Sequence, residues 1–230
     1  MRTRFSTPPS RSLASRTAAT AALLGGILAL QSGGADAGQE PTAPEWTLAA
    51  SDAASRLLSR AIAAAEPHHG RTCEVEAIDV AAGSTPQLER PLGPAAVIDE
   101  FTASAWVRTN RPGIRLAARV VLPGFMSRKT GRPVELLLPG PASADVDRWG
   151  QVRVAGLPQA LARRMPALHL EHGPQGTAAG AAVTHLVLDL PPAPGRQQIA
   201  IDDVSVAGSV PIAGRGKSAI VRSSVLFPAP

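Results

Sequence analysis

The residues best suited to chemistry in this chain are one cysteine, two histidine pairs and scattered carboxylates. No arrangement in the sequence identifies a base that could activate Cys73, so a buried thiol is the better interpretation than a nucleophile. His169 and His172 fall on a stretch that we expect to be extended, where their spacing does not place both rings on one face. Asp99 and Glu100 are adjacent carboxylates without a predicted pocket, and the GxSxG and HExxH motifs are absent. The sequence therefore predicts a protein that is not an enzyme.

Charge and glycine patterns argue against nucleotide and nucleic-acid binding. Residues 214–218, GRGKS, end like a phosphate loop, but the upstream glycine of that motif falls on Pro211. The formal net charge is +5, and without residues 1–37 it falls to 19 basic against 17 acidic residues. No basic run is interleaved with aromatic residues, so we expect no nucleic-acid partner. His68 and His69 are interpreted as a loop pair.

The elements that must position any site read as β-strands, most clearly in residues 97–122. Phe101, Ala103, Ala105 and Val107 alternate with polar or larger residues, and this period of two is typical of a strand with one buried face. Residues 110–113, NRPG, are typical of a tight turn, and an aliphatic run follows. We therefore predict a hairpin at the centre of a β protein.

Several other short segments have strand character and are bounded by glycine or proline. Residues 51–66 remain open between a helix, by alanine content, and a strand. Residues 159–165 form the best short helix and should end at Pro166. Residues 71–80 are a strand candidate with Glu74 and Glu76 outward. The remaining strand candidates are 87–92, 134–138, 149–154, 168–171, 183–190 and 198–207. The pattern predicts an all-β fold, a two-layer antiparallel β-sandwich with one short helix.

The N-terminal segment has the features of a secretory signal. Four arginines precede an apolar core at residues 18–30, and Ala35-Asp36-Ala37 offers a small-x-small cleavage pattern. An uncleaved anchor is the alternative. We expect residues 1–37 to be a signal peptide, 38–44 a linker, 45–208 the domain and 209–230 a flexible tail or linker. The protein should be exported, to the periplasm or beyond, and should meet a membrane only through the signal peptide.

Three motifs resemble the galactose-binding-like jelly rolls, a group that includes carbohydrate-binding modules. They are FTASAWVRTNRPG at 101–113, THLVLDL at 184–190 and QIAIDDVSVAG at 198–208. The longer pattern, with TGRPVELLLPG at 130–140, resembles a module near the N-terminus of large exported bacterial proteins. The resemblance covers residues 45–208 and implies a jelly-roll β-sandwich.

The resemblance also implies a structural Ca²⁺ site. In such modules a carboxylate on the closing strand helps to hold the ion, which assigns Asp202 or Asp203 here, with Glu74, Glu76 or Glu66 as a second carboxylate. Hard oxygen ligands suit Ca²⁺, and only one of two adjacent strand residues can face inward. The alternative is a solvated acid beside one that accepts a hydrogen bond from the backbone.

A sugar-binding surface is the other implication of the resemblance. Trp46, Trp106 and Trp149 could stack on sugar rings, although core packing is the better interpretation of Trp149. Four arginines could reach sugar hydroxyls or carboxylates, or could be solvated residues of the outer face: Arg108, Arg115, Arg119 and Arg153. Three Trp, four Phe and no Tyr cannot build a broad stacking platform.

Two hypotheses for function follow from these residues. The first is an exported, non-catalytic, carbohydrate-binding-like module, as an N-terminal part of a larger glycan-active protein, with a polysaccharide or glycan as its partner. The second is a structural or protein-interaction β-sandwich that binds no sugar and has a protein partner. The family resemblance favours the first hypothesis, and the scarcity of aromatic residues favours the second.

Overall fold

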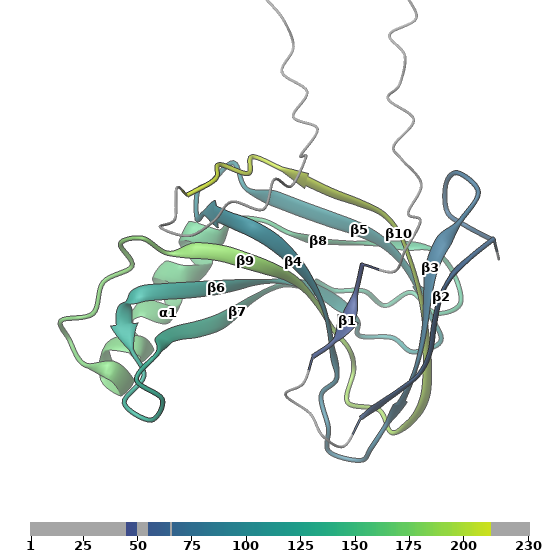
Figure 1. Ribbon diagram of the computed structural model, residues 1–230, viewed down its shortest axis with the longest axis horizontal. Helices are drawn as coiled ribbons and strands as arrows, with labels where there is room; N and C mark the ends of the chain where they lie inside the picture. Colours follow the sequence, from purple (N-terminus) through teal and green to yellow (C-terminus); the bar gives the residue numbers. More distant parts are fainter. Residues whose placement is uncertain (1–44, 50–54, 65, 213–230) are drawn as a thin grey trace, which may run out of the picture. The chain divides into compact units, whose positions relative to one another are not determined.

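Two antiparallel sheets of five strands each make up the computed structural model, which describes residues 45–49, 55–64 and 66–212 (Figure 1). All described residues belong to one compact unit. Sheet A has, in spatial order, β1 (Thr47–Leu48), β4 (Gln87–Ala96), β9 (Ala182–Asp189), β6 (Arg115–Met126) and β7 (Pro133–Ala142). Sheet B has β2 (Arg56–Ala63), β3 (Cys73–Val80), β10 (Gly195–Ala207), β5 (Thr102–Thr109) and β8 (Gly150–Val154). The predicted two-layer β-sandwich is confirmed.

One hydrophobic core lies between the sheets, and the alternation in β5 leads directly to it. Ala103, Ala105 and Val107 are at most 2% exposed, while the residues between them are partly exposed. Leu116 and Val120 of β6 are fully buried in the same cluster. Since neighbouring side chains on a strand point to opposite faces, the residues between them lie on the outer face.

The prediction of a hairpin in residues 97–122 is wrong, although both strands exist. β5 pairs with β8 and β10, whereas β6 pairs with β7 and β9, so the turn at 110–113 carries the chain from one sheet to the other. Gly113 has φ of +100° there, and its N–H donates to the Ser143 carbonyl at 2.7 Å. The crossing allows two successive apolar faces to enter one core from opposite sides.

The stretch left open between helix and strand contains the strand β2. It is antiparallel to β3 from Arg56 to Ala63, with one register shift between Leu57 and Ser59. The pairing gives the backbone groups of β2 that face β3 partners along a strand that is already fixed in the sheet. This tertiary gain exceeds the intrinsic preference of alanine for helix.

The helix is longer than predicted, because α1 spans Leu157–His172 and continues through Pro166. Residues 168–171, expected to be extended, are therefore helical. An interior proline costs roughly 3 kcal/mol through its missing N–H and steric clash. Leu161 and Leu168 are buried on either side of it and join the core, so packing offsets that cost. α1 lies beside β6 and β7 (Figure 1).

The structure describes only part of the segments that were predicted at the two ends of the chain. The proposed signal peptide 1–37, the linker 38–44 and residues 213–230 lie outside the described residues. Residues 209–212 of the predicted tail run along β4, where the Ala96 N–H donates to the Val210 carbonyl at 2.8 Å. The Ile212 N–H likewise donates to Pro94 at 2.9 Å. None of the described helices has the length and apolar character to span a membrane.

Candidate functional site

The outer face of sheet B carries most of the residues that could bind a ligand. Ser104 of β5 lies opposite Ser205 of β10 and Arg153 of β8. Trp106, two residues along β5, lies opposite Asp202 and Gln151 in the same way. Strand pairing thus sets side chains from three strands in two adjacent rows on one face.

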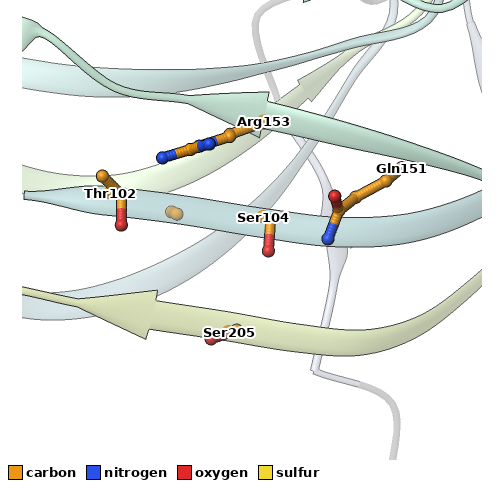
Figure 2. Close-up of a pocket in the computed structure, with 6 residues that line it drawn as sticks. Thr102, Ser104, Gln151, Arg153 and Ser205 are labelled. Carbon is orange, nitrogen blue, oxygen red and sulfur yellow. The ribbon is translucent and has the colours of Figure 1, made fainter.

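A shallow polar groove lies around the row formed by Ser104, Ser205 and Arg153. It has a volume of about 140 Å³. Figure 2 shows side chains from three neighbouring strands around it, and its lining residues are Thr102, Ala103, Ser104, Gln151, Arg153 and Ser205. Arg153 makes no ion pair with another described residue, and no lining side chain is acidic. Hydroxyl, amide and guanidinium groups together offer donors and acceptors to a ligand rich in oxygen.

Gly140 on β7 allows β8, which carries two groove residues, to take its position. A Cβ on Gly140 would lie 1.9 Å from the backbone oxygen of Arg153, far inside contact distance. The backbones of β7 and β8 therefore approach more closely than any side chain at this position would permit. The edge of sheet A thereby helps to place Arg153 on sheet B.

Beside the groove, three rings pack into an aromatic cluster formed by His68, Trp106 and Trp149. His68 stacks on Trp106, with ring centroids 3.8 Å apart and planes inclined by 14°. Trp149 meets His68 edge-on at 5.8 Å, and the Arg108 guanidinium lies 5.4 Å from the centre of the Trp149 ring. One face of Trp106 is thus already covered by a residue of the loop between β2 and β3.

That loop, residues 66–72, is held on sheet B by polar contacts. The Asp202 Oδ2 accepts hydrogen bonds from the backbone amides of His68 at 2.9 Å and His69 at 3.0 Å. Glu66 forms an ion pair with Arg108, and its carbonyl accepts a hydrogen bond from Trp149 Nε1 at 3.2 Å. Carboxylate acceptors on backbone amides are among the stronger hydrogen bonds in proteins.

A β-bulge in β10 orients the second aspartate of the pair. The register with β5 shifts between Asp202 and Ser205, and Asp203 has φ of +45° within it. Its Oδ2 lies 2.8 Å from His68 Nδ1. Bulges re-aim side chains, and a positive φ outside glycine is uncommon. The fold therefore accepts a strained backbone to point Asp203 at the loop.

The structure brings three of the four predicted ligand-binding residues together. Trp106, Arg108 and Arg153 share the outer face of sheet B. Arg115 does not join them, because it lies on β6 of sheet A with its Nε 2.8 Å from Asp189 Oδ2. Sugar binding by any of these residues stays a prediction.

The tryptophans divide differently from expectation. Trp149, interpreted as a core residue, is half-buried in the aromatic cluster, because it precedes β8 and turns outward over the loop. Trp46 is 1% exposed in the core and cannot stack on a ligand. Of the three, only Trp106 and Trp149 are available to a surface site.

The five carboxylates implied as calcium ligands do not all come together, and Glu66 is paired with Arg108. Glu74 pairs with Ile201 and Glu76 with Ile199, both in the core, so these glutamates face inward. Asp202 is on the opposite face, beneath the loop. The residues present do not fit the implied site, and calcium binding itself stays a prediction.

The expectation that Glu74 and Glu76 point outward is wrong, since they are only 4% and 0% exposed. Glu74 accepts hydrogen bonds from the amides of Glu45 at 2.9 Å and Trp46 at 3.0 Å, which fastens β1 to the interior. Burial, and then the charge of Glu74, raise the pKa of Glu76 to about 8, against the lowering effect of Arg60. Burial also raises the pKa of Glu74, although the two amides oppose it.

Sequence reasoning missed the polar part of the groove and the role of the loop. Ser104 has the same strand parity as Trp106, and Gln151 the same parity as Arg153, so alternation could have added both. Ser205 and His68 carried no such signal. Both reach the site through a bulge or a loop contact across more than 100 residues of sequence.

No family model and no curated protein matches the sequence. Among solved structures, the chain is similar to a carbohydrate-binding module of the β-sandwich superfamily, with 7% identity over 70% of this chain and 56% of that chain, at a TM-score of 0.40. It is also similar to the family 11 carbohydrate-binding module of a cellulosomal cellulase from Clostridium thermocellum (6% identity, 74% and 91% coverage, TM-score 0.43). A xylan-binding domain of family 22 gives 12% identity, 74% and 92% coverage and a TM-score of 0.42. These proteins are of the class that the sequence resemblance named.

Proposed function

We propose that the chain is an exported, non-catalytic module that binds a polysaccharide on the outer face of sheet B. The observation that carries the proposal is the polar groove beside the aromatic cluster on one accessible sheet face. Sugar hydroxyls both donate and accept hydrogen bonds, and Ser104, Gln151 and Arg153 present matching groups. Trp106 and Trp149, which are half-buried on the same side of sheet B, would add apolar contact to the C–H faces of a sugar ring.

The shape of the site also supports a chain-like ligand. Its lining comes from three adjacent antiparallel strands on one face of sheet B, an arrangement that suits a ligand lying along the sheet better than an enclosed small molecule. A surface of this kind holds an extended polymer through several weak contacts, and the benefit to an attached partner is a high local concentration.

The competing function is a structural or protein-interaction domain. One observation favours it: His68 lies flat on Trp106, which leaves less aromatic surface for a sugar. A protein partner would use the same polar face without needing an exposed ring.

Retention on polysaccharides distinguishes the two functions. The full-length protein should be retained on at least one member of a panel of insoluble and gel-embedded plant and bacterial polysaccharides. Replacing Arg153 and Gln151 together by alanine should weaken retention by at least about tenfold, the equivalent of two lost hydrogen bonds.

The matched control is Arg115→Ala, which removes an arginine from sheet A and should leave retention unchanged. If the folded wild-type protein is retained by no glycan, the carbohydrate proposal is wrong and the interaction domain replaces it. Equal loss of retention in the control variant would move the site away from the groove.

A further inference from the structure

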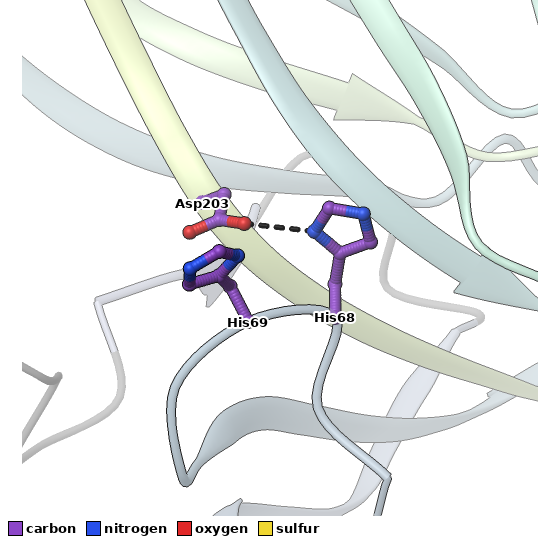
Figure 3. A group of neighbouring side chains, drawn as sticks. All are labelled: His68, His69 and Asp203. Atoms are coloured by element: carbon purple, nitrogen blue, oxygen red, sulfur yellow. Dashed lines mark hydrogen bonds and ion pairs between the residues drawn. The ribbon is translucent and has the colours of Figure 1, made fainter. Parts of the chain in front are cut away.

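A second cluster on sheet B has ligand groups for a metal ion. His68 and His69 of the loop face Asp203 of β10, and one ligand atom from each lies within 4.8 Å of the other two (Figure 3). His68 Nδ1 lies 2.8 Å from Asp203 Oδ2. His69 and Asp203 are exposed and His68 is half-buried, so an ion in solution can reach them.

The donor set indicates which class of ion would bind. Two imidazoles and one carboxylate are typical ligands of Zn²⁺ and neighbouring divalent transition metals, with a fourth position left to water. Ca²⁺ instead takes about six to eight oxygen ligands, and this cluster offers one carboxylate. The chemistry differs from that of the calcium site suggested by the sequence resemblance.

The ligands are held in place by contacts that an ordinary surface cluster does not need. Asp202 accepts hydrogen bonds from the backbone amides of both histidines and so fixes the loop that carries them. The His68 ring is oriented by its stacking on Trp106. Such supporting contacts are characteristic of sites where ligand orientation matters.

Backbone strain is concentrated at the same place. Asp203 at φ +45° and Glu66 at φ +50° are two of the three described residues other than glycine with positive φ. Strained residues persist where the surrounding structure fixes them, and they gather at functional sites. Here the two lie on the two segments that the cluster joins.

We propose that His68, His69 and Asp203 bind a divalent transition-metal ion of the Zn²⁺ class, which fastens the loop 66–72 to β10. Bound metal would then hold His68 on Trp106 and stiffen the border of the polar groove. The site does not depend on what the groove binds, so metal binding and glycan retention can fail separately.

The test uses full-length protein without a histidine tag, and Zn²⁺ alone as the probe in isothermal titration calorimetry. Wild-type protein should bind one Zn²⁺ per chain. His69→Gln and Asp203→Asn should each weaken that affinity at least about tenfold. Asparagine tolerates the positive φ of Asp203, so the second variant should retain the fold. His185→Gln, on sheet A, is the matched control and should bind as wild type does.

A second measurement tests the fastening of the loop. Hydrogen exchange of the amides in residues 66–72 should slow when Zn²⁺ is added to wild-type protein and should not change in His69→Gln. Saturable binding that both variants retain, or no binding by the wild type, would overturn the site. Binding of Ca²⁺ by the same residues in place of Zn²⁺ would overturn the class of ion, and unchanged exchange on Zn²⁺ binding would overturn the fastening.

Discussion

The outer faces of the two sheets differ in how their arginines are paired. On sheet A, Arg115 is paired with Asp189 at 2.8 Å, and Arg119 forms two hydrogen bonds with Glu89. On sheet B, Arg153 lines a groove without an ion pair to another described residue. A cross-strand carboxylate neutralises an arginine on the first face, and the second leaves one facing solvent.

On the inner faces, too, sheet B carries the less conventional charged residues. Sheet A contributes aliphatic residues such as Leu116 and Leu188 to the core, whereas sheet B also buries the glutamate pair Glu74 and Glu76. Both oxygens of Glu76 are buried without a hydrogen-bond partner among the described residues. Departures from the simple rules of burial and pairing thus concentrate in sheet B, where function is expected to lie.

The largest expected effect comes from the buried glutamates of sheet B and concerns the pH dependence of stability. The pKa of Glu76 is raised from an ordinary 4.5 to about 8 in the folded protein, mainly by burial. The folded state therefore keeps a proton that the unfolded chain loses, and stability should fall as pH rises from about 5 to 8. Glu76→Gln should flatten this dependence and raise the free energy of unfolding at pH 9 by on the order of 3 kcal/mol.

Chemical denaturation of both proteins at pH 5, 7 and 9 measures the effect. Glu135→Gln, at an exposed position of β7 in sheet A, is the control and should follow the wild-type curve. Parallel pH profiles for wild type and Glu76→Gln would show that sheet B carries no buried acid of this kind.

The next effect should come from the carboxylate that holds the loop. Asp202→Ala removes the acceptor of three backbone amides, two of them in the loop, and should lower the free energy of unfolding by about 2 kcal/mol. That corresponds to a fall in melting temperature of roughly 4–8 °C, measurable by circular dichroism. Asp202→Asn keeps a neutral acceptor, so its melting temperature should lie between those of the wild type and Asp202→Ala. A melting temperature unchanged by Asp202→Ala would mean that the loop does not depend on this contact.

The smallest effect belongs to sheet A. Arg115→Ala removes an ion pair whose arginine side chain is 45% exposed, and such pairs contribute less than about 1 kcal/mol. The melting temperature should change by no more than roughly 2–4 °C. A larger loss would show that the paired arginines of sheet A contribute to the fold as much as the contacts of sheet B.

The individual strands of this fold were easier to predict from the sequence than the strands with which they pair. Alternation in residues 101–107 identified β5 and its buried face, because that pattern depends only on local geometry. It could not show that β6 would leave for the other sheet, since the same turn serves a hairpin or a crossing. The inward Glu74 of β3 was missed for a similar reason: its partners are the backbone amides of Glu45 and Trp46, just before β1 and about 30 residues away in sequence.

The candidate site was predictable where it followed a single strand. Trp106 and Arg108 share strand parity, and their common face could be inferred from the sequence. The contact of His68 and His69 with the aspartates of β10 spans more than 130 residues and depends on a bulge. No local pattern contains that information, so the cluster emerged only from the folded chain.

Cys73 gives this part of the molecule a chemical reporter of local opening that is already present in the sequence. It is the sole cysteine of the chain, fully buried, and follows the loop directly on the strand face that also carries Asp202. Burial, and then the nearby Asp202 charge, raise the pKa of this thiol, so a reagent should modify it slowly unless the structure around it opens. The rate of thiol labelling then measures how often the structure around Cys73 opens, without any introduced probe.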